Sequence, residues 1–255
     1  MELLGYSRAV FVILAVLALI PGGAIAGSTR PITIELEAGP VWQTRNDVEI
    51  PNDGTATRFS LVDLVGSGPY FSYRAYISFD FARKHGVRLL LAPLTIEDSG
   101  TPSEPIRFEG ETFESGTPAN ATYRFNSYRL TYRYTLLDNE RWCWRVGLTG
   151  KIRDAEISLA QRGVSASNSN VGFVPLLHLS GEWRWSQRLS MLLDADALAA
   201  SQGRAEDVAV KLSYRAADRW TMAVGYRMLE GGADVEDVYT FAWLHYAVVS
   251  VAVRL

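Results

Sequence analysis

The feature that most constrains this chain is a period of two in its apolar residues, which recurs from residue 32 to residue 255. In residues 70–82, aromatic and aliphatic side chains occupy every second position and mostly polar ones lie between them. This spacing places the apolar side chains on one face of a β-strand. Past residue 31 no apolar run approaches the roughly 18 residues typical of a membrane-spanning helix. We therefore predict an all-β protein.

Ten segments carry this pattern, and most are about ten residues long or longer, whereas ordinary strands have about five or six. A strand that crosses a bilayer at a tilt needs about 9–11 residues. The ten predicted strands are 32–44, 70–82, 87–96, 120–136, 142–157, 172–185, 189–200, 207–216, 219–229 and 238–255.

The connections between these strands alternate in length. The short ones are 83–86, 138–141, 186–188 and 216–219, and the long ones are 45–69, 97–119, 158–171, 201–206 and 230–237. Short turns on one side and longer loops on the other are typical of transmembrane β-barrels. A closed barrel pairs every backbone polar group within lipid and leaves no open edge.

Aromatic residues gather beside the short connections. Rings at the ends of neighbouring strands would form a girdle at one membrane interface, where amphipathic aromatics are favoured. The predicted girdle consists of Phe79, Phe81, Tyr132, Tyr134, Trp142, Trp144, Trp183, Trp185, Tyr214 and Trp220.

With these features the chain resembles the small bacterial outer-membrane β-barrel proteins. The resemblance implies an antiparallel up-and-down barrel in the outer membrane, in contact with outer-membrane lipid and lipopolysaccharide, and inserted by the barrel-assembly machinery. Those proteins usually end in an aromatic residue, whereas this chain ends in Leu255. We expect a monomer without a cofactor.

The first residues have the three parts of a secretory signal. Arg8 precedes the apolar run of residues 9–20, a Pro-Gly-Gly break follows, and Ala24 and Ala26 supply the small residues of a cleavage site. The run is shorter than the roughly 20 residues of a spanning helix. We predict a signal peptide of residues 1–26, cleaved after Ala26, and a barrel domain of residues 27–255.

Two details of the strand assignment have alternatives. Residues 57–65 and 106–114 could each add a strand and make a barrel of twelve, although we prefer ten because both segments are short and alternate poorly. The parity of the apolar positions also slips at Asn126–Ser127, which predicts a β-bulge.

The polar face of the strands carries both signs of charge and would line the lumen. At ten strands the lumen is narrow, since eight strands are just filled by side chains. We predict a lumen largely plugged by ion pairs, with a narrow porin-like channel as the alternative. The predicted lumen network is Glu35, Glu37, Arg74, Arg124, Lys151, Arg153, Glu182, Arg184, Asp194 and Asp196.

A set of arginines on two neighbouring strands allows two interpretations. They could form an inner ladder that attracts anions, or they could pair with acids across the lumen, which we favour because the acids are numerous enough. The arginines are Arg124, Arg129, Arg133, Arg145 and Arg153.

One constellation suggests catalysis. His178 and Ser180 lie two residues apart on one predicted strand, followed by Glu182, and a base beside a hydroxyl can activate a serine. The outer-membrane lipid A 3-O-deacylases look similar here, which implies an acyl hydrolase as the alternative function. Our register points His178 inward, away from lipid, and Glu182 is too far along the strand to orient it. We expect a non-enzymatic protein.

The remaining composition excludes other classes of site. A single cysteine excludes intrachain disulfides and cysteine-clustered metal centres, and a net charge of −3 argues against nucleic-acid binding. The first and last long loops should meet, because the first and last strands of a barrel are neighbours. Their carboxylates could bind divalent cations, although we expect them to be solvated. They are Asp47, Glu49, Asp53, Asp234, Glu236 and Asp237.

Overall fold

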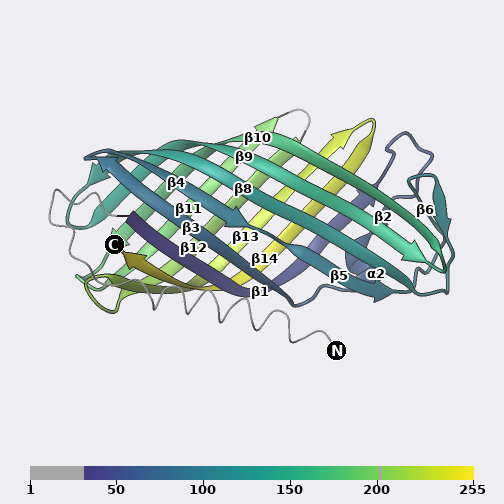
Figure 1. Cartoon of the computed structure of the whole chain (residues 1–255), viewed down its shortest axis with the longest axis horizontal. Helices are drawn as coiled ribbons and strands as arrows, with labels where there is room; N and C mark the ends of the chain where they lie inside the picture. Colours follow the sequence, from purple (N-terminus) through teal and green to yellow (C-terminus); the bar gives the residue numbers. More distant parts are fainter. Residues whose placement is uncertain (1–31, 201–202) are drawn as a thin grey trace. The chain divides into compact units, whose positions relative to one another are not determined.

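A computed structural model describes residues 32–200 and 203–255 as a closed antiparallel β-barrel (Figure 1). The predicted signal peptide, residues 1–26, and its cleavage site after Ala26 lie outside the described residues.

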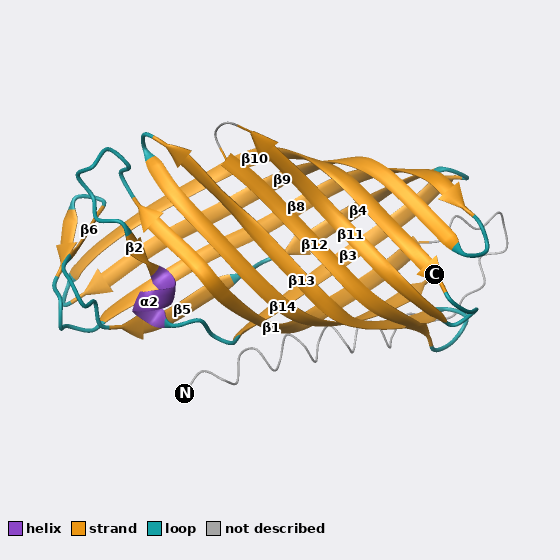
Figure 2. Ribbon diagram, turned by 180° about the vertical axis from the view of Figure 1, so that it is seen from behind, coloured by secondary structure: helices purple, strands orange, loops and turns teal. Residues whose placement is uncertain are grey.

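Ten long strands form the wall of the barrel, which confirms the predicted fold class (Figure 2). Each strand is antiparallel to its neighbours, and β14 pairs with β1 to close the sheet. The strands are β1 (Ile32–Glu49), β3 (Tyr70–Ala82), β4 (His85–Ala92), β8 (Ala119–Asp138), β9 (Trp142–Gln161), β10 (Val164–Arg184), β11 (Leu189–Ala200), β12 (Gly203–Arg215), β13 (Trp220–Val235) and β14 (Val238–Arg254).

All four predicted short connections are tight turns, and local side chains fix the geometry of two of them. Between β8 and β9, the Asn139 side chain accepts hydrogen bonds from the backbone N–H groups of Arg141 and Trp142. Between β10 and β11, the hydroxyl of Ser186 accepts from the backbone N–H groups of Arg188 and Leu189. These side chains replace backbone partners that a turn leaves unsatisfied.

The predicted strand 87–96 is interrupted in the structure. β4 ends at Ala92, and β5 (Thr95–Gly100) resumes pairing with the same neighbour, β8. Pro93 lies in the gap, and a proline has no N–H to donate to a ladder. The backbone N–H of Leu94 instead donates to the side chain of Asn126.

The long connections are shorter than predicted, because several strands continue beyond the predicted ends. The expected loop 158–171 is mostly strand, and β9 and β10 meet in a two-residue turn at Arg162–Gly163. Both residues have positive φ, 48° and 88°. That pattern is the mirror-image turn that matches the twist of a hairpin, and glycine adopts it readily.

The predicted bulge at Asn126–Ser127 is wrong. β8 and β9 stay in regular register there, and the register shift in this pair lies between Thr135 and Leu137. Tyr123 and Phe125 belong to the same inward face as Ser127 and Arg129. The apparent slip in parity arose because the barrel interior is apolar near Tyr123 and Phe125. We had assumed that inward residues are polar along the whole strand.

The twelve-strand alternative is also wrong. Residues 57–65 contain only the two-residue strand β2 (Phe59–Ser60) and the short helix α2 (Leu61–Val65). β2 pairs with Asp47 and Val48 at the long-loop end of β1. Residues 106–114 form a separate hairpin of β6 (Ile106–Phe108) and β7 (Glu111–Phe113). The hairpin pairs only with itself and is not part of the wall.

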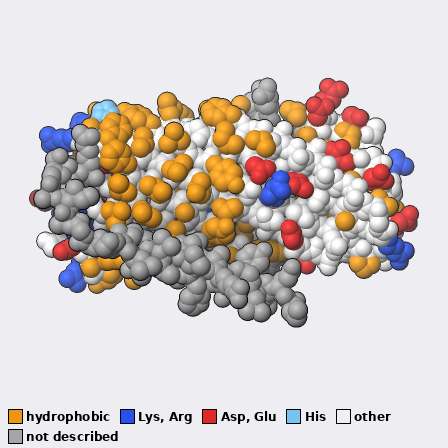
Figure 3. Space-filling model, in the orientation of Figure 1, with side chains coloured by type: hydrophobic (Ala, Val, Ile, Leu, Met, Phe, Trp, Pro, Cys, Tyr) orange, Lys and Arg blue, Asp and Glu red, His pale blue; other side chains and the backbone are white. Residues whose placement is uncertain are grey.

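The outer surface of the barrel is divided into an apolar and a polar zone. Figure 3 shows hydrophobic side chains gathered over the half nearer the short turns, and a mainly polar surface towards β2, α2 and the β6–β7 hairpin. On β8 the outward residues change from Leu130 and Tyr128 to Asn126 and Arg124. The apolar zone is the belt that lipid would cover, and the polar zone would extend into water.

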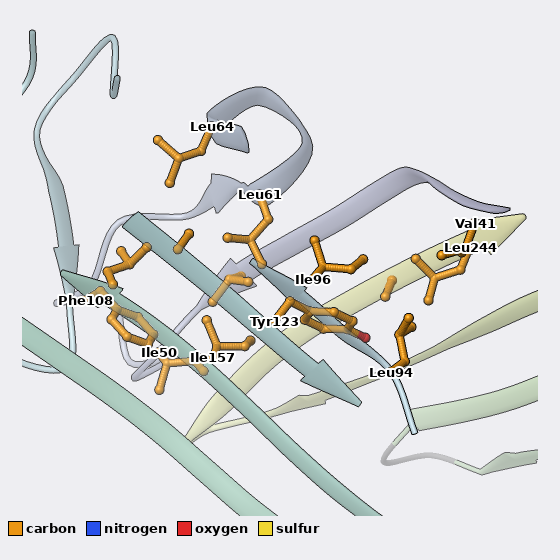
Figure 4. Close-up of a cluster of buried hydrophobic side chains, with 14 of the residues drawn as sticks. Val41, Ile50, Leu61, Leu64, Leu94, Ile96, Phe108, Tyr123, Ile157 and Leu244 are labelled. Atoms are coloured by element: carbon orange, nitrogen blue, oxygen red, sulfur yellow. The ribbon is translucent and has the colours of Figure 1, made fainter. Parts of the chain in front are cut away.

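An apolar core closes part of the barrel at the long-loop end. Side chains from α2 and the β6–β7 hairpin pack against inward residues of β1, β5, β8 and β9, as seen in Figure 4. Phe108 is fully buried and meets Phe59 edge to face, with ring centroids 6.1 Å apart. We call this cluster the outer plug; its central residues are Val41, Ile50, Leu61, Leu64, Leu94, Ile96, Phe108, Tyr123, Ile157 and Leu244.

Candidate functional site: a charged septum in the barrel interior

The middle of the lumen is crossed by a network of buried charges centred on Asp207 of β12. Its carboxylate accepts hydrogen bonds from three guanidinium groups on three other strands. Arg74 Nη1 donates at 2.9 Å, Arg129 Nη2 at 2.6 Å and Arg227 Nη1 at 2.5 Å. Because the donors come from β3, β8 and β13, one carboxylate ties together separate parts of the wall.

A second carboxylate, Glu37 of β1, extends the network. Arg227 Nε donates to Glu37 Oε1 at 2.9 Å, and Lys211 Nζ donates to Glu37 Oε2 at 2.9 Å. Lys211 also binds Glu35, and Arg227 Nη2 donates to the hydroxyl of Tyr76 at 2.8 Å. Glu37 is therefore held by two cations that are themselves held by other residues.

The third part of the network surrounds Asp196 of β11. Arg129 Nη1 donates to Asp196 Oδ2 at 2.8 Å, and the hydroxyl of Thr149 donates to Oδ1 at 2.9 Å. His178 Nδ1 lies 2.9 Å from the same oxygen, Oδ1. Nearby, Arg88 binds both oxygens of Asp194. We call the residues described in these three paragraphs the septum.

The septum forms because alternate residues of every strand point inward, and the narrow lumen brings opposite walls within side-chain reach. Burying these charges is costly, and pairing with opposite charges offsets this cost. Removing one partner of such a buried pair typically costs about 3–5 kcal/mol, because the other charge is left uncompensated.

Two cavities lie on either side of the septum. The larger, about 750 Å³, lies towards the long-loop end and is bounded by Arg129, Asp196 and Asp207. The smaller, about 270 Å³, lies towards the short turns and is bounded by Tyr76 and Arg227. No residue lines both cavities. In the described part of the chain, the septum therefore lies between these two cavities.

The structure places every predicted lumen residue inward except Arg124. Glu35, Glu37, Arg74, Lys151, Arg153, Glu182, Arg184, Asp194 and Asp196 each line one of the two cavities or bind within the septum. Arg124 instead lies on the outer surface, where it pairs with Asp154 at 3.3 Å and Glu156 at 2.6 Å. Our inward assignment of Arg124 failed because polar residues face outward where the strand leaves the apolar belt.

The predicted arginine ladder is largely a set of ion pairs. Arg129 binds Asp196 and Asp207, and Arg133 and Arg145 both lie near Asp80, at 3.4 and 3.6 Å. Arg153 donates to the amide oxygen of Asn170. Four of the five arginines thus pair with acids, but only Arg129 pairs across the lumen in the way that the pairing interpretation expects.

The predicted girdle residues lie beside the short turns and contact one another across strands. Trp142 of β9 stacks on Trp183 of β10 with ring centroids 5.3 Å apart, and Trp183 meets Trp185 edge to face at 5.4 Å. His85 adds an unpredicted member, since it lies 5.2 Å from the Tyr134 ring and 2.6 Å from the Tyr132 hydroxyl.

The His178–Ser180 pair does not have the geometry of an activated serine. Among the described residues, Ser180 makes no hydrogen bond to His178, and it lines the smaller cavity, whereas His178 lines neither. A carboxylate does stand behind the imidazole, but it is Asp196 of β11 and not Glu182. His178 Nε2 is buried without a partner in the described part of the chain. The pair faces the septum, away from the lipid-facing belt.

The acidic loop residues are divided among local partners. Asn52 Nδ2 donates to Asp234 at 3.1 Å, which shows that the first and last long loops meet. Asp47 pairs with Arg45 and Glu49 with Arg58. Asp53 accepts two hydrogen bonds from Thr55, which lower the pKa of that carboxyl below its ordinary value. In the described ranges no three or more ligand residues gather into a metal-binding group.

The predicted lumen network lacked several septum residues, among them Tyr76, Asp207 and Arg227. Asp207 has the same parity as Lys211 on one strand, so the alternation alone could have identified it as inward. Arg227 lies between the outward Tyr226 and Met228 and carries the same signal. What no parity rule supplies is the partner, because pairing across the lumen depends on how the closed barrel staggers its strands.

Comparisons with known proteins identify the fold. No family model and no curated relative matches the chain. Among solved structures, the outer membrane protease OmpT of Escherichia coli is similar, with a TM-score of 0.52 at 10% identity over 91% of this chain and 99% of that one.

Two further matches are weaker. The translocator domain of the autotransporter NalP from Neisseria meningitidis has a TM-score of 0.43 at 12% identity, covering 98% of each chain. Ail of Yersinia pestis has a TM-score of 0.41 at 11% identity, covering 88% of this chain and 98% of that one. In the described residues no helix is long and apolar enough to cross a membrane.

The likeness to OmpT agrees with the closed sheet, the apolar belt and the aromatic girdle. The chain has the fold of the bacterial outer-membrane β-barrel proteins.

Proposed function

We propose that this chain is an integral outer-membrane protein that is closed along its axis and has a structural or surface role. The observation that supports this proposal is the septum, in which Asp207, Glu37 and Asp196 join opposite walls between two separate cavities. The outer plug also fills part of the lumen at the long-loop end.

A closed axis follows from the energetics of the septum. A hydrated ion that passes through the lumen must separate several buried ion pairs at once. Separating even one leaves a charge uncompensated, at about 3–5 kcal/mol.

Thiol accessibility on each side of the septum tests the proposal. In a Cys143→Ser background, a single cysteine is placed in the larger cavity (Asn170→Cys) or in the smaller one (Ser78→Cys). The protein is reconstituted into sealed liposomes, and its orientation is measured with Asp53→Cys in the first long loop. A small membrane-impermeant thiol reagent is then added outside.

When the long loops face outward, we expect Asn170→Cys to react and Ser78→Cys to be protected until the liposomes are opened. Equal reaction at both sites from the long-loop side would show a continuous path through the lumen and would contradict the closed axis.

A further inference from the structure

The barrel wall is incomplete on one side of β10. β10 pairs with β11 only from Leu177, opposite Ala197, down to Arg184. From Val164 to Leu176 the strand continues to pair with β9, but no described strand pairs with its other edge. β11 ends at Ala200 and does not reach the long-loop end of β10. We call the gap beside residues 164–176 of β10 the notch.

A proline lies where the wall begins to open. The backbone N–H of Trp185 donates to Leu189 on the β11 side, and that of Arg184 donates to Arg141 on the β9 side. β10 has no register shift against β9. The backbone N–H groups of its odd-numbered residues therefore all point towards the β11 side. Pro175 is odd-numbered and has no N–H to offer. A proline on that edge ends the ladder where the notch starts.

The larger cavity lies directly behind the notch. Its lining includes Val174, Pro175 and Leu176 from β10 and Leu198 from β11, which stand on opposite sides of the gap. The outward residue Phe173 stands at the edge and is 67% exposed. At about 750 Å³, the cavity has the size of ordinary small-molecule sites. The mouth therefore has an apolar edge at the upper limit of the lipid-facing belt.

One buried cation in this cavity has no acidic partner. Lys151 of β9 stands opposite Val174, one residue from the start of the notch, and only 3% of its surface is exposed. Its Nζ lies 4.6 Å from the centroid of the Phe125 ring. In contrast to Lys211, it has no carboxylate within 4.0 Å among the described residues.

A second cation stands beside it. Arg153 lies two residues further along the same inward face of β9 and lines the same cavity. Its Nε is buried and has no partner in the described part of the chain. Burying a cation without an anion is costly. The carboxylates Asp196 and Asp207 also line this cavity, but arginines already bind both of them. Lys151 and Arg153, which have no carboxylate partner within the described ranges, thus make a site for a negatively charged group.

We propose that the notch is a lateral entrance to a binding site for a single-chain anionic amphiphile. The carboxylate or phosphate headgroup would bind Lys151 and Arg153, and the acyl chain would pass over Leu176 and leave through the notch beside Phe173. This assignment does not depend on the closed axis, because the path runs through the wall and stops above the septum.

The first experiment measures binding with defined probes. The purified protein in a neutral maltoside detergent is mixed with palmitate, lysophosphatidic acid, hexadecanol or hexadecyltrimethylammonium, and bound ligand is counted by native mass spectrometry. The proposal expects both anions, or one of them, to bind at least tenfold more tightly than the neutral and cationic chains. Palmitate alone would identify a free carboxylate as the headgroup, and lysophosphatidic acid alone would identify a lipid phosphate.

Variants then locate the site. Lys151→Met keeps the length of the side chain and removes its charge, so it should weaken binding of the anion at least tenfold. Lys84→Met in a short turn is the matched control and should bind like the wild type. A palmitate with a diazirine near the middle of its chain should label β10 between residues 164 and 176. Its labelling does not require any variant to fold.

Binding of all four probes with equal affinity, binding of none, or unchanged affinity in Lys151→Met would overturn the proposal. So would labelling spread evenly around the apolar belt, because this would show chains adsorbed to the outside of the barrel.

Discussion

At the scale of single residues, the interior depends on a few carboxylates that each serve several cations. Asp207 is the clearest case, because Arg74, Arg129 and Arg227 all donate to it. Replacing it with asparagine keeps the shape and removes the charge. We predict that Asp207→Asn lowers the free energy of unfolding by about 3–5 kcal/mol, measured by urea titration in detergent micelles.

The matched control for that variant is Asp138→Asn. Asp138 also binds an arginine, Arg184, but it is exposed at a short turn. A surface ion pair contributes about 0–1 kcal/mol. Equal losses in the two variants would show that the septum contributes no more than a surface pair.

At the scale of elements, the edge of β10 makes a prediction about amide exchange. Odd-numbered amides of β10 face the notch above Leu177, and even-numbered ones face β9. We predict that Ser165, Ser167 and Val171 exchange faster in deuterated buffer than Ala166 and Asn168, as measured by NMR. Below Leu177 both sets should be protected. Uniform protection along the whole strand would show that another segment covers the notch.

The β6–β7 hairpin makes a second prediction at this scale. Its strands pair only with each other, so packing and a few hydrogen bonds, such as that from the backbone N–H of Glu109 to Ile50, hold it in place. Phe108→Ala should weaken the docking of the hairpin by about 3–5 kcal/mol and speed proteolysis there, while the barrel unfolds at nearly the same urea concentration. Thr112→Ala, on the exposed side of the hairpin, is the control. A large fall in the stability of the whole barrel would contradict a plug that is separate from the wall.

The elements also show where sequence alone is sufficient. Wherever one face meets lipid and the other the lumen, as in residues 70–82, the alternation predicted the strand and its bounds closely. The outer part of β10 was assigned to a loop because both of its faces are polar, as in Ser165–Asn170, so no contrast remains to be read. Arg124 was placed in the lumen for a different reason: its inward neighbours Tyr123 and Phe125 are apolar and the outer surface there is polar, which inverts the rule.

At the scale of the whole molecule, a barrel that spans lipid need not conduct. The predicted lumen residues and the ten strands follow from alternation, but the closure of the axis does not. It depends on which strands face each other across the lumen, for example β12 opposite β3 and β8. The number of strands in the closed barrel and the stagger of their register decide which strands face each other. The septum and the outer plug are therefore properties of the assembled barrel.

Planar-bilayer recording of the purified wild-type protein tests this account most directly. We predict no conductance steps after insertion, which is verified by the mobility shift between heated and unheated samples on gels. Stable steps from the wild-type protein, and above all steps selective for anions, would contradict a closed axis and would favour a channel lined by the inner arginines.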